Sequence, residues 1–363
     1  MDKYINKLNF DFQTNQKILN LISQIDLYKG KWNSIEKQEN IYLKELRKIA
    51  TIESIGSSTR IEGGTLTDKE IEELLNDIKI TKLKTRDEQE VVGYYDTLEI
   101  IYENYDNIKL SENYIKQLHQ NLLRHSDKDT RHRGEYKSLS NKVVANYPGG
   151  IQKVIFNTTE VHLVNSEMND LISWTNSQFK NKEIHPLIIV ANLVYEFLSI
   201  HPFHDGNGRL SRLLTTLLLI KSKYNFVQYV SFEHIIEESK KEYYKSLMEC
   251  QSNRTSDITT SERELEKIDK WLIFFLNSLL RLTSKLDNKV EQIKTQGNYL
   301  NLRQKKIQKI LLTSSALKVS DIHSYFPDTN IYSIKKDLAD LVSKNIIQKK
   351  GERNSTMYFI LDL

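Results

Sequence analysis

The chain has 363 residues, of which 39% are hydrophobic and 28% charged, with four prolines and twelve glycines. This length allows two or three domains with a core of ordinary size, and so little Pro and Gly excludes long coil linkers and favours a mainly α-helical protein. The net charge of +4 arises at the end of the chain, where residues 300–363 hold eleven Lys or Arg against six Asp or Glu. So modest an excess more often marks a solvated surface than a nucleic-acid site.

Three features of the sequence predict a cytoplasmic protein. The single cysteine, Cys250, cannot form a disulfide within the chain, which suits a reducing compartment. The first residues, MDKYINKLNFDFQ, lack the apolar segment of a signal peptide. No apolar run reaches the roughly 18 residues that a membrane span requires, so we expect no membrane partner.

The first 90 residues are expected to form an N-terminal helical segment. Residues 1–50 place apolar side chains at helical spacing, as in NQKILNLISQIDLYKGKW, and predict one or two antiparallel helices. The helix that follows should stop at Gly63 and the glycine after it. Thr67 and Glu70 then have the spacing of a capping box and predict the start of another helix.

Residues 91–295 are expected to form an all-helical central domain with one small β-hairpin. The stretch RHRGEYKSLSNKVVANYPGGIQKVIFNTTEV contains glycines, a proline and short β-prone runs, which predict a loop and a hairpin. Two of the helical segments are apolar almost all round, so we expect them at the centre of the domain. Helical periodicity marks residues 86–105, 111–124, 163–180, 185–203, 210–223, 239–250 and 268–293.

Residues 296–363 predict a separate winged-helix domain. LRQKKIQKILLT, KVSDIHSYF and TNIYSIKKDLADLVSKN read as helices, and the strand-like runs IIQKK and MYFIL flank GERNST. Three helices followed by a two-stranded wing are the order of a winged helix, a relative of the helix-turn-helix. Lys335 and Lys336 are candidate phosphate contacts, although Asp337 and Asp340 dilute their charge.

The string HPFHDGNGRLSR, residues 201–212, joins the two most apolar helices. Gly206 and Gly208 allow the backbone to approach a ligand closely. The N–H groups at the start of the next helix, together with its dipole, form an anion cradle. Arg209 and Arg212 lie on neighbouring helical positions, so both can reach a polyphosphate held there.

Two further groups in this string can take part in chemistry. Asp205 can ligate one Mg2+ that shares its other sites with phosphate oxygens and water. His201, with an ordinary pKa near 6.5, can accept a proton from an incoming hydroxyl. With the anion cradle, these groups predict nucleotidyl or phosphoryl transfer. An alternative takes His201, His204 and Asp205 as ligands of a hydrolytic transition metal, which the adjacent arginines oppose.

These residues resemble the motif HPFx(D/E)GNGRxxR of the Fic family at every defined position. GEYK at residues 134–137 resembles the family's Gly-x-Tyr-Arg, with Lys137 in place of the arginine, and the resemblance extends over residues 45–290. It implies an all-helical Fic core with a small β-hairpin flap. It also implies the transfer of AMP from ATP to a hydroxyl side chain of a target protein, and of the protein itself.

The resemblance assigns a role to each matching residue. It implies that His201 deprotonates the acceptor hydroxyl and that Asp205 holds Mg2+. The residues that it places against the phosphates of ATP are Gly206, Asn207, Gly208, Arg209 and Arg212. Tyr243 and Tyr244 match a pair that borders the adenine pocket, or are packing residues. Some relatives move other phosphate-containing groups, but the intact motif favours ATP as the donor.

Two partner surfaces are expected. Residues 153–161, KVIFNTTEV, occupy the place of the family's flap, which binds the backbone of the target by strand pairing. Such pairing uses backbone groups and requires little of the target's sequence, so the sequence of this chain does not identify the target. The N-terminal helices are a candidate interface for a homo-oligomer, which no sequence feature decides.

A second motif resembles the inhibitory segment (S/T)xxxE(G/N) that precedes the Fic core in part of the family. SSTRIEGG supplies Ser58, Glu62 and Gly63 at the required spacing. The resemblance implies that Glu62 pairs with Arg212, the group that should receive the γ-phosphate. Glu62 could instead be a solvated acid at a helix end with Gly63 as its C-cap, or could align a water molecule that removes AMP.

A different class of function also remains open. Residues 296–363 would then carry the main function. The protein would be a DNA-binding transcriptional regulator whose helical domain senses nucleotide. Winged helices also bind proteins, so we expect either DNA or protein as the partner of this domain.

Overall fold

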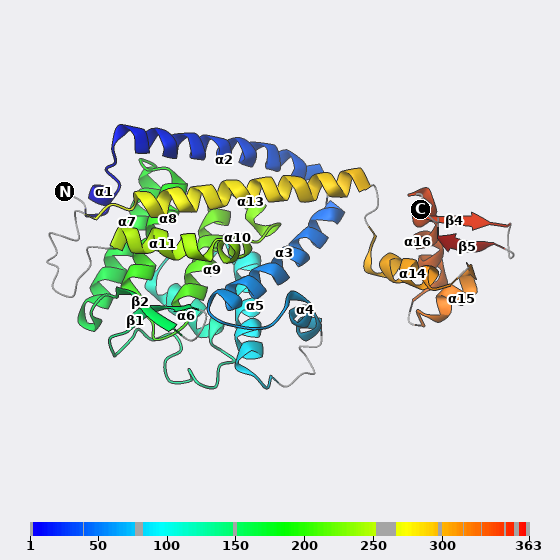
Figure 1. Ribbon diagram of the computed structural model, residues 1–363, viewed down its shortest axis with the longest axis horizontal. Coiled ribbons are helices and arrows are strands. Elements are labelled where there is room, and N and C mark those ends of the chain that lie inside the picture. The colour runs from blue at the N-terminus through cyan, green and yellow to red at the C-terminus, as the bar shows by residue number, and fades with distance from the viewer. Residues whose placement is uncertain are drawn as a thin grey trace. The chain divides into compact units, whose positions relative to one another are not determined.

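The computed structural model describes residues 3–38, 40–76, 83–147, 151–251, 266–296, 300–314, 316–327, 329–344, 346–351 and 356–360. The chain forms two compact units, Met1–Leu286 and Asp287–Leu363. Figure 1 shows that helices dominate both, so the predicted mainly α fold is confirmed. The first unit contains both segments that the sequence analysis separates at residue 90, and the predicted domain boundaries remain predictions.

The helices of the first unit follow the predicted periodic segments closely. The main difference is that the second apolar helix begins at Asn207 rather than at residue 210, which places the motif glycines at its N-terminus. The elements are α1 (Lys3–Lys7), α2 (Phe12–Gln38), α3 (Asn40–Ile61), α4 (Asp68–Asn76), α5 (Arg86–Asn104), α6 (Glu112–Leu122), η1 (Val161–Leu163), α7 (Val164–Asn181), α8 (Pro186–Ile200), α9 (Asn207–Lys221), η2 (Asn225–Gln228), α10 (Phe232–Glu238), α11 (Lys240–Gln251) and α13 (Asp269–Gln296), which continues into the second unit.

Side chains at the N-termini explain where several helices begin. The backbone N–H of Thr67 donates to the Glu70 carboxylate over 2.8 Å, and the N–H of Glu70 donates back to the Thr67 hydroxyl over 3.3 Å, so the predicted capping box forms. Thr85 and Glu88 form the same reciprocal cap at the start of α5. Pro186 occupies the first turn of α8, where its missing N–H costs no hydrogen bond.

Helices α8 and α9 form the centre of the first unit, as their apolar sequences predict. Nearly every side chain of both helices is buried, and α8 packs against α7 and α9. In Figure 1 they lie within the bundle, with α2 along one side. A central helix is covered on all faces, so its sequence shows apolar residues all round rather than in one stripe. The loop between α8 and α9 therefore starts and ends in rigid core.

The predicted hairpin is present in the first unit. Strands β1 (Lys142–Tyr147) and β2 (Ile151–Asn157) pair antiparallel, with Lys142 opposite Asn157 and a bulge at Val143 and Val144. The bulge adds twist and bends the strand locally. The hairpin contacts α11.

The second unit contains α14 (Leu302–Leu312), β3 (Leu317–Lys318), α15 (Val319–Ser324), α16 (Ile331–Ser343), β4 (Ile347–Lys350) and β5 (Met357–Ile360). Its strands form an antiparallel sheet in the order β3-β5-β4. The short strand β3 was not predicted, because two residues carry no alternation. The core of this unit is apolar and comprises Leu300, Ile307, Leu311, Ile322, Phe326, Ile334, Leu338, Leu341, Ile346 and Ile347.

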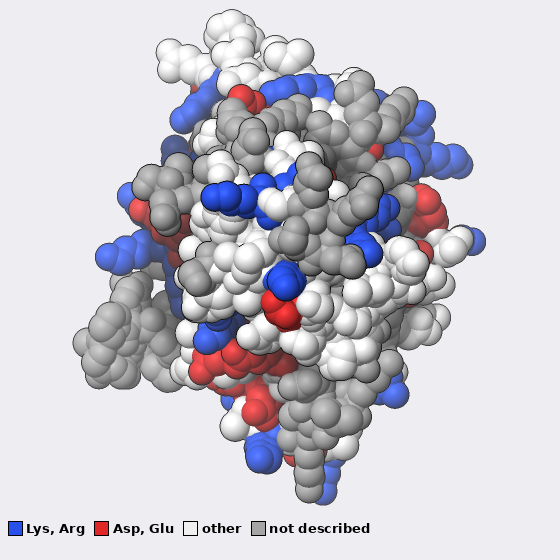
Figure 2. All heavy atoms as spheres, turned by 90° about the vertical axis from the view of Figure 1, so that its right-hand side faces the viewer, with Lys and Arg blue, Asp and Glu red and all other residues white. Residues whose placement is uncertain are grey.

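Two surface observations bear on partners. Among the residues that the structure describes, every helix is too short or too polar to cross a bilayer. On the face drawn in Figure 2, Lys and Arg side chains are interspersed with Asp and Glu and do not form one continuous basic field. A mixed surface of this kind is consistent with the modest net charge of the chain.

Candidate active site

The loop between α8 and α9 is fixed by its own backbone and one amide side chain. His201 ends α8 in the left-handed region at φ 52°, and Gly206 precedes α9 at φ 77°. Phe203 is completely buried between these two turns. The Asn207 side chain accepts from the Phe203 N–H over 2.9 Å and donates to the Phe203 carbonyl over 2.8 Å. Asn207 therefore clamps the loop with its amide, and only its backbone N–H is left to face an anion.

A buried histidine outside the motif supports the same loop. The ring of His119 on α6 stacks on Phe203 with centroids 3.7 Å apart. The Gly134 N–H donates to its Nδ1 over 2.9 Å, so Nε2 carries the proton and donates to the Asp205 carbonyl over 3.0 Å. Burial lowers the pKa of His119 to about 4, which keeps the ring neutral. His119 thus positions the loop through one fixed tautomer.

The state of His201 follows from its hydrogen bond and its surroundings. Its Nδ1 lies 3.3 Å from the Leu198 carbonyl, which can only accept, so Nδ1 carries the proton and Nε2 has a free lone pair. Burial, reinforced by the positive charge of Lys137, lowers the pKa of His201 to about 4. The imidazole is therefore neutral at physiological pH, which is the form that a general base requires.

Lys137 connects this loop to the base of the hairpin. Its side chain is buried, and its ammonium donates to the Asn141 side chain (2.8 Å), the Thr158 hydroxyl (2.7 Å) and the Ile200 carbonyl (3.2 Å). Its backbone N–H also donates to the Pro202 carbonyl over 2.7 Å. Asn141 and Thr158 flank β1 and β2, so one cation joins both strands to the residue before His201. Burial lowers the pKa of Lys137 to about 8.

Asp205 is ionised and surrounded by positive charge. Its Oδ1 accepts from the Gly206 N–H over 2.6 Å and lies 3.2 Å from Arg209, and its Oδ2 lies 3.0 Å from Arg86 on α5. Burial opposes ionisation, but the charge of Arg209, the Gly206 amide and Arg86 outweigh it, so the pKa of Asp205 lies below its usual value. An ionised carboxylate is the hard oxygen ligand that Mg2+ prefers.

Arg209 lies away from the expected cradle. Its side chain is only 1% exposed, and its guanidinium lies 3.1 Å from Glu90 and 3.2 Å from Asp205. In this structure Arg209 orients the Asp205 carboxylate, and its contact with a phosphate remains a prediction.

Glu62 occupies the N-terminus of α9. Its Oε1 accepts from the Arg212 guanidinium over 2.8 Å. The same oxygen packs so closely on the Gly208 backbone that a Cβ at this position would collide with it. Arg212 also donates to the Ser58 hydroxyl (2.8 Å) and carbonyl (2.9 Å). Because the start of a helix attracts anions, the carboxylate takes the place that a phosphate would take.

Residues 109–219 match the sequence model of the Fic/DOC family. This part of the chain is a Fic domain. The chain is similar to the protein adenylyltransferases Fic of Aedes aegypti, at 31% identity over 191 residues, and of Drosophila willistoni, at 30% over 191 residues. These matches cover 51% and 52% of this chain but 35% of each relative, so the chain spans about a third of their length.

Two crystal structures share the fold of the chain. A Fic family protein from Desulfovibrio desulfuricans covers 95% of this chain and 96% of its own, with a TM-score of 0.68 and 21% identity. A Fic domain containing signaling protein from Bacteroides thetaiotaomicron covers 72% of this chain and 95% of its own, with a TM-score of 0.59 and 25% identity. The Fic fold is therefore common to proteins that differ widely in sequence.

The segment that brings Glu62 to the Fic domain is held at its end by ion pairs. Arg60 on α3 pairs with Glu237 on α10 (2.7 Å) and with Asp68 on α4 (2.9 Å). Lys240 donates to the Ile61 carbonyl over 2.6 Å. Gly63, at φ 106°, then turns the chain, and the Gly64 N–H donates to the Thr59 carbonyl over 2.9 Å. This left-handed turn ends the helix. The last residue of α3 is Ile61, and Glu62 lies between the helix end and the turn.

Of the two predicted tyrosines, Tyr243 lies close to Arg212. Tyr243 is 3% exposed and packs against Tyr244 and Trp271, with centroids 5.1 and 5.9 Å away. Burial raises the pKa of Tyr243 to about 12, although Arg212 opposes the rise. Tyr243 is thus part of the packed core at the edge of the site, and a contact of either tyrosine with adenine remains a prediction.

The transition-metal alternative has little support in the described residues, where no group of three or more His, Cys, Asp and Glu could hold a metal ion. The His204 ring lies 4.5 Å from that of His132. A single magnesium ion on Asp205, completed by phosphate oxygens and water, remains compatible with the Fic domain.

Sequence reasoning missed His119, Arg86 and Glu90, which position Asp205 and its loop. Each lies on a helix 80 or more residues before the motif in a pattern typical of an ordinary helix face. The only usable signal was a histidine among apolar positions of α6, and a lone histidine of that kind is most often structural.

Proposed function

We propose that this protein transfers AMP from ATP to a hydroxyl side chain of a target protein, and to itself, and that Glu62 inhibits the transfer. One observation carries the proposal. The free Nε2 of a neutral His201, the ionised Asp205 and the N-terminus of α9 meet on one rigid loop, where a carboxylate already fills the anion cradle. The relatives named protein adenylyltransferase Fic support the same activity.

The proposed step uses groups of this loop and of α9. Nε2 of His201 accepts the proton of the acceptor hydroxyl, and the hydroxyl oxygen bonds to the α-phosphorus. The bond from that phosphorus to the bridging oxygen breaks, and pyrophosphate leaves with the electron pair. The Gly206 N–H is already bound to Asp205, so the backbone N–H groups of Asn207 and Gly208 hold the phosphates, and Arg212 neutralises their charge. Mg2+, held by Asp205, would supply further charge neutralisation.

Inhibition follows because the Glu62 carboxylate and the γ-phosphate of ATP compete for the N-terminus of α9. While Glu62 pairs with Arg212 and covers the Gly208 backbone, a γ-phosphate cannot occupy the same N-terminus. ATP must then displace the carboxylate or bind in an unproductive position.

Intact-mass measurement of the Glu62→Gly protein with MgATP tests the activity. We expect a mass increase equal to AMP, and none in the Glu62→Gly, His201→Ala protein. An increase of a different mass would show that a group other than AMP is transferred. Absence of label on the protein and on all proteins of a cell extract, with ATP binding intact, would refute AMP transfer.

The same sample distinguishes inhibition from AMP removal. If Glu62 also aligned water, wild-type protein added to the purified AMP-labelled variant would release AMP. If Glu62 acts only as an inhibitor, the label persists.

The target is proposed to dock on the hairpin. Strand β2 and the following residues, 153–161, are joined to the loop before His201 through Lys137 and Thr158. Pairing of a target backbone with this hairpin would bring a hydroxyl close to the base.

A second candidate function concerns the second unit, which we propose is a winged helix that contacts duplex DNA. Two carboxylates that could repel DNA are neutralised internally. Asp337 is buried and pairs with Arg303, and Asp340 lies 2.6 Å from Lys344. The exposed residues of α16 include Tyr332, Lys335 and Lys336.

A salt titration of duplex binding by the full chain tests this second function. We expect affinity to fall as salt rises and the Lys335→Glu, Lys336→Glu variant to bind more weakly. If wild type shows no binding at low salt, the function is excluded, and a protein partner becomes the alternative.

A further inference from the structure

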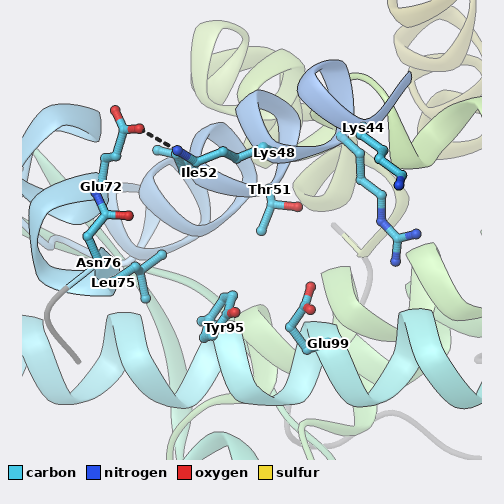
Figure 3. Close-up of a pocket in the computed structure, with 10 residues that line it drawn as sticks. Lys44, Lys48, Thr51, Ile52, Glu72, Leu75, Asn76, Tyr95 and Glu99 are labelled. Carbon is cyan, nitrogen blue, oxygen red and sulfur yellow. Dashed lines mark hydrogen bonds and ion pairs between the residues drawn. The ribbon is translucent and has the colours of Figure 1, made fainter. Parts of the chain in front are cut away.

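A cavity of about 300 Å3 lies between α3, α4 and α5, outside the site described above. Figure 3 shows Thr51 directed from α3 into it, Tyr95 and Glu99 rising from α5, and Leu75 and Asn76 at the end formed by α4. Ten residues line it: Lys44, Arg47, Lys48, Thr51, Ile52, Glu72, Leu75, Asn76, Tyr95 and Glu99. Its volume is at the low end of the roughly 300–1,000 Å3 of ligand pockets, so it suits a small molecule.

The charges on the α3 wall indicate an anionic ligand. Three cations, Lys44, Arg47 and Lys48, lie within little more than one helical turn. Lys48 is neutralised by Glu72 at 2.7 Å. Within the described part of the chain, Lys44 and Arg47 form no ion pair with a carboxylate, and Arg47 lies 4.3 Å above the Tyr102 ring. Lys44 and Arg47 therefore line the cavity outside any ion pair, and Glu99 is the carboxylate that attracts Arg47 there.

The remaining lining narrows the class of ligand. Glu99 also lines the cavity, and burial raises the pKa of its carboxyl against the attraction of Arg47. Thr51, Asn76 and Tyr95 offer neutral hydrogen-bonding groups, and Ile52 and Leu75 offer an apolar surface. A phosphate monoester has close to two negative charges at neutral pH and can carry a small apolar or ring group, so it matches both features.

We propose that this cavity binds a small phosphate monoester and that binding stabilises the position of α3 in which Glu62 fills the cradle. This regulation depends on the proposed inhibition by Glu62. The binding site itself does not.

All three walls are connected to the active site. Helix α3 ends at Ile61, directly before Glu62, and α4 is tied to that end because Asp68 pairs with Arg60. Helix α5 carries Arg86 and Glu90, which contact Asp205 and Arg209. The cavity has its present shape while Glu62 occupies the cradle, and a ligand stabilises the state to which it binds better. The ligand is therefore expected to oppose ATP, and by linkage ATP to oppose the ligand.

Titration calorimetry of the full chain with phenyl phosphate tests the site. We expect one saturable site, at least tenfold weaker in the Lys44→Glu, Arg47→Glu variant and unchanged in Lys17→Glu, a matched charge reversal on the exposed face of α2. Lys44→Glu alone, at an exposed position, serves if the double variant does not fold. Absence of saturable binding, or equal binding to the cavity variants and wild type, would overturn the proposal.

Two further ligands test which parts of phenyl phosphate are needed for binding. Inorganic phosphate tests whether the charge suffices without the ring, and benzoate tests whether one negative charge suffices. Tighter binding of benzoate than of phenyl phosphate would refute the phosphate class.

The coupling is measured as ATP affinity at saturating phenyl phosphate. We expect a severalfold loss of ATP affinity in wild type and none in Glu62→Gly, where no carboxylate competes. If phenyl phosphate binds but ATP affinity does not change, regulation is refuted and the site stands. If Glu62→Gly transfers no AMP while phenyl phosphate binding persists, the proposed function fails independently.

Discussion

The motif loop and Glu62, at the end of α3, both border the N-terminus of α9, but they are held in contrasting ways. The loop is fixed by buried hydrogen bonds between neutral groups from Asn207 and His119, and by the ammonium of Lys137. Glu62 has one ion pair to Arg212, and its side chain is 35% exposed. Buried networks resist change because each broken bond leaves an unsatisfied group, whereas a part-exposed pair can exchange with water. The difference describes a rigid loop and a carboxylate that can leave its position.

The largest expected effect is the loss of the base. In a Glu62→Gly background, His201→Ala should lower the rate of AMP transfer by about 10^2–10^4, the usual range for general-base catalysis. The initial rate of label transfer from α-phosphate-labelled ATP measures it. A change below tenfold would show that another group accepts the proton.

The rigidity of the loop is tested by removing its support. His119→Ala should lower the free energy of unfolding by about 2–4 kcal/mol, because it removes the packing on Phe203 and leaves the Gly134 N–H and Asp205 carbonyl unpaired. Urea unfolding gives the value, and His162→Ala, on an exposed 3-10 helix, should change it by less than about 0.5 kcal/mol. Equal effects of both variants would contradict the contrast.

The free energy of unfolding should also depend on pH. The folded pKa values of His119 and His201, about 4, lie below the value of 6.5 expected when unfolded. Between these limits the unfolded chain binds more protons, so the free energy of unfolding should decrease as pH falls from 6.5 to 4. His119→Ala should reduce this slope, and an unchanged slope would show that other groups cause it.

The part-exposed ion pair of Glu62 predicts that AMP transfer rises when the carboxylate is removed. Glu62→Gly should raise AMP transfer by about 10- to 100-fold, the gain expected from removing a competing charged hydrogen bond of about 1.5–3 kcal/mol. Glu73→Gly, at an exposed position of α4, makes the same replacement away from Arg212 and should leave the rate unchanged. If Glu62→Gly does not raise the rate, the Glu62 carboxylate does not inhibit AMP transfer.

The cradle itself can be blocked independently of Glu62. Gly208→Ala should weaken ATP binding by about tenfold, or 1.4 kcal/mol, because its methyl group would occupy the space at the helix start that an anion needs. The loss should persist in the Glu62→Gly background, as calorimetry would show. ATP binding unaffected in both backgrounds would place the phosphates elsewhere.

The smallest expected effect is a shift of pH dependence. Lys137→Met removes a positive charge that holds down the pKa of His201, so the acid limb of kcat/KM in the Glu62→Gly background should move upward by less than about one unit. Lys137→Arg keeps the charge and should leave the limb near pH 4. If both variants behave alike, Lys137 acts on the loop through packing alone.

The contrast also explains what sequence could and could not predict. Helix periodicity identified the two buried helices, and the glycines between them identified the cradle, because both signals are local. The ring of His119 and the ion pairs of Arg86 and Glu90 depend on which helices meet in space, which no local pattern encodes. The burial of Arg209 against Glu90 was missed for the same reason, since an arginine near a helix start gives no sign of which way it points.

The left-handed turn at Gly63 sets a strict phase for α3. Each residue of an α-helix rotates the next by 100°, and Arg60, Ser58 and Glu62 must face α10, α9 and the cradle together. Insertion or deletion of one residue between Ile55 and Glu62 would swing the carboxylate to another side of the helix. The contact of Glu62 with Arg212 is therefore more sensitive to a change of length near the end of α3 than to a substitution that keeps the length.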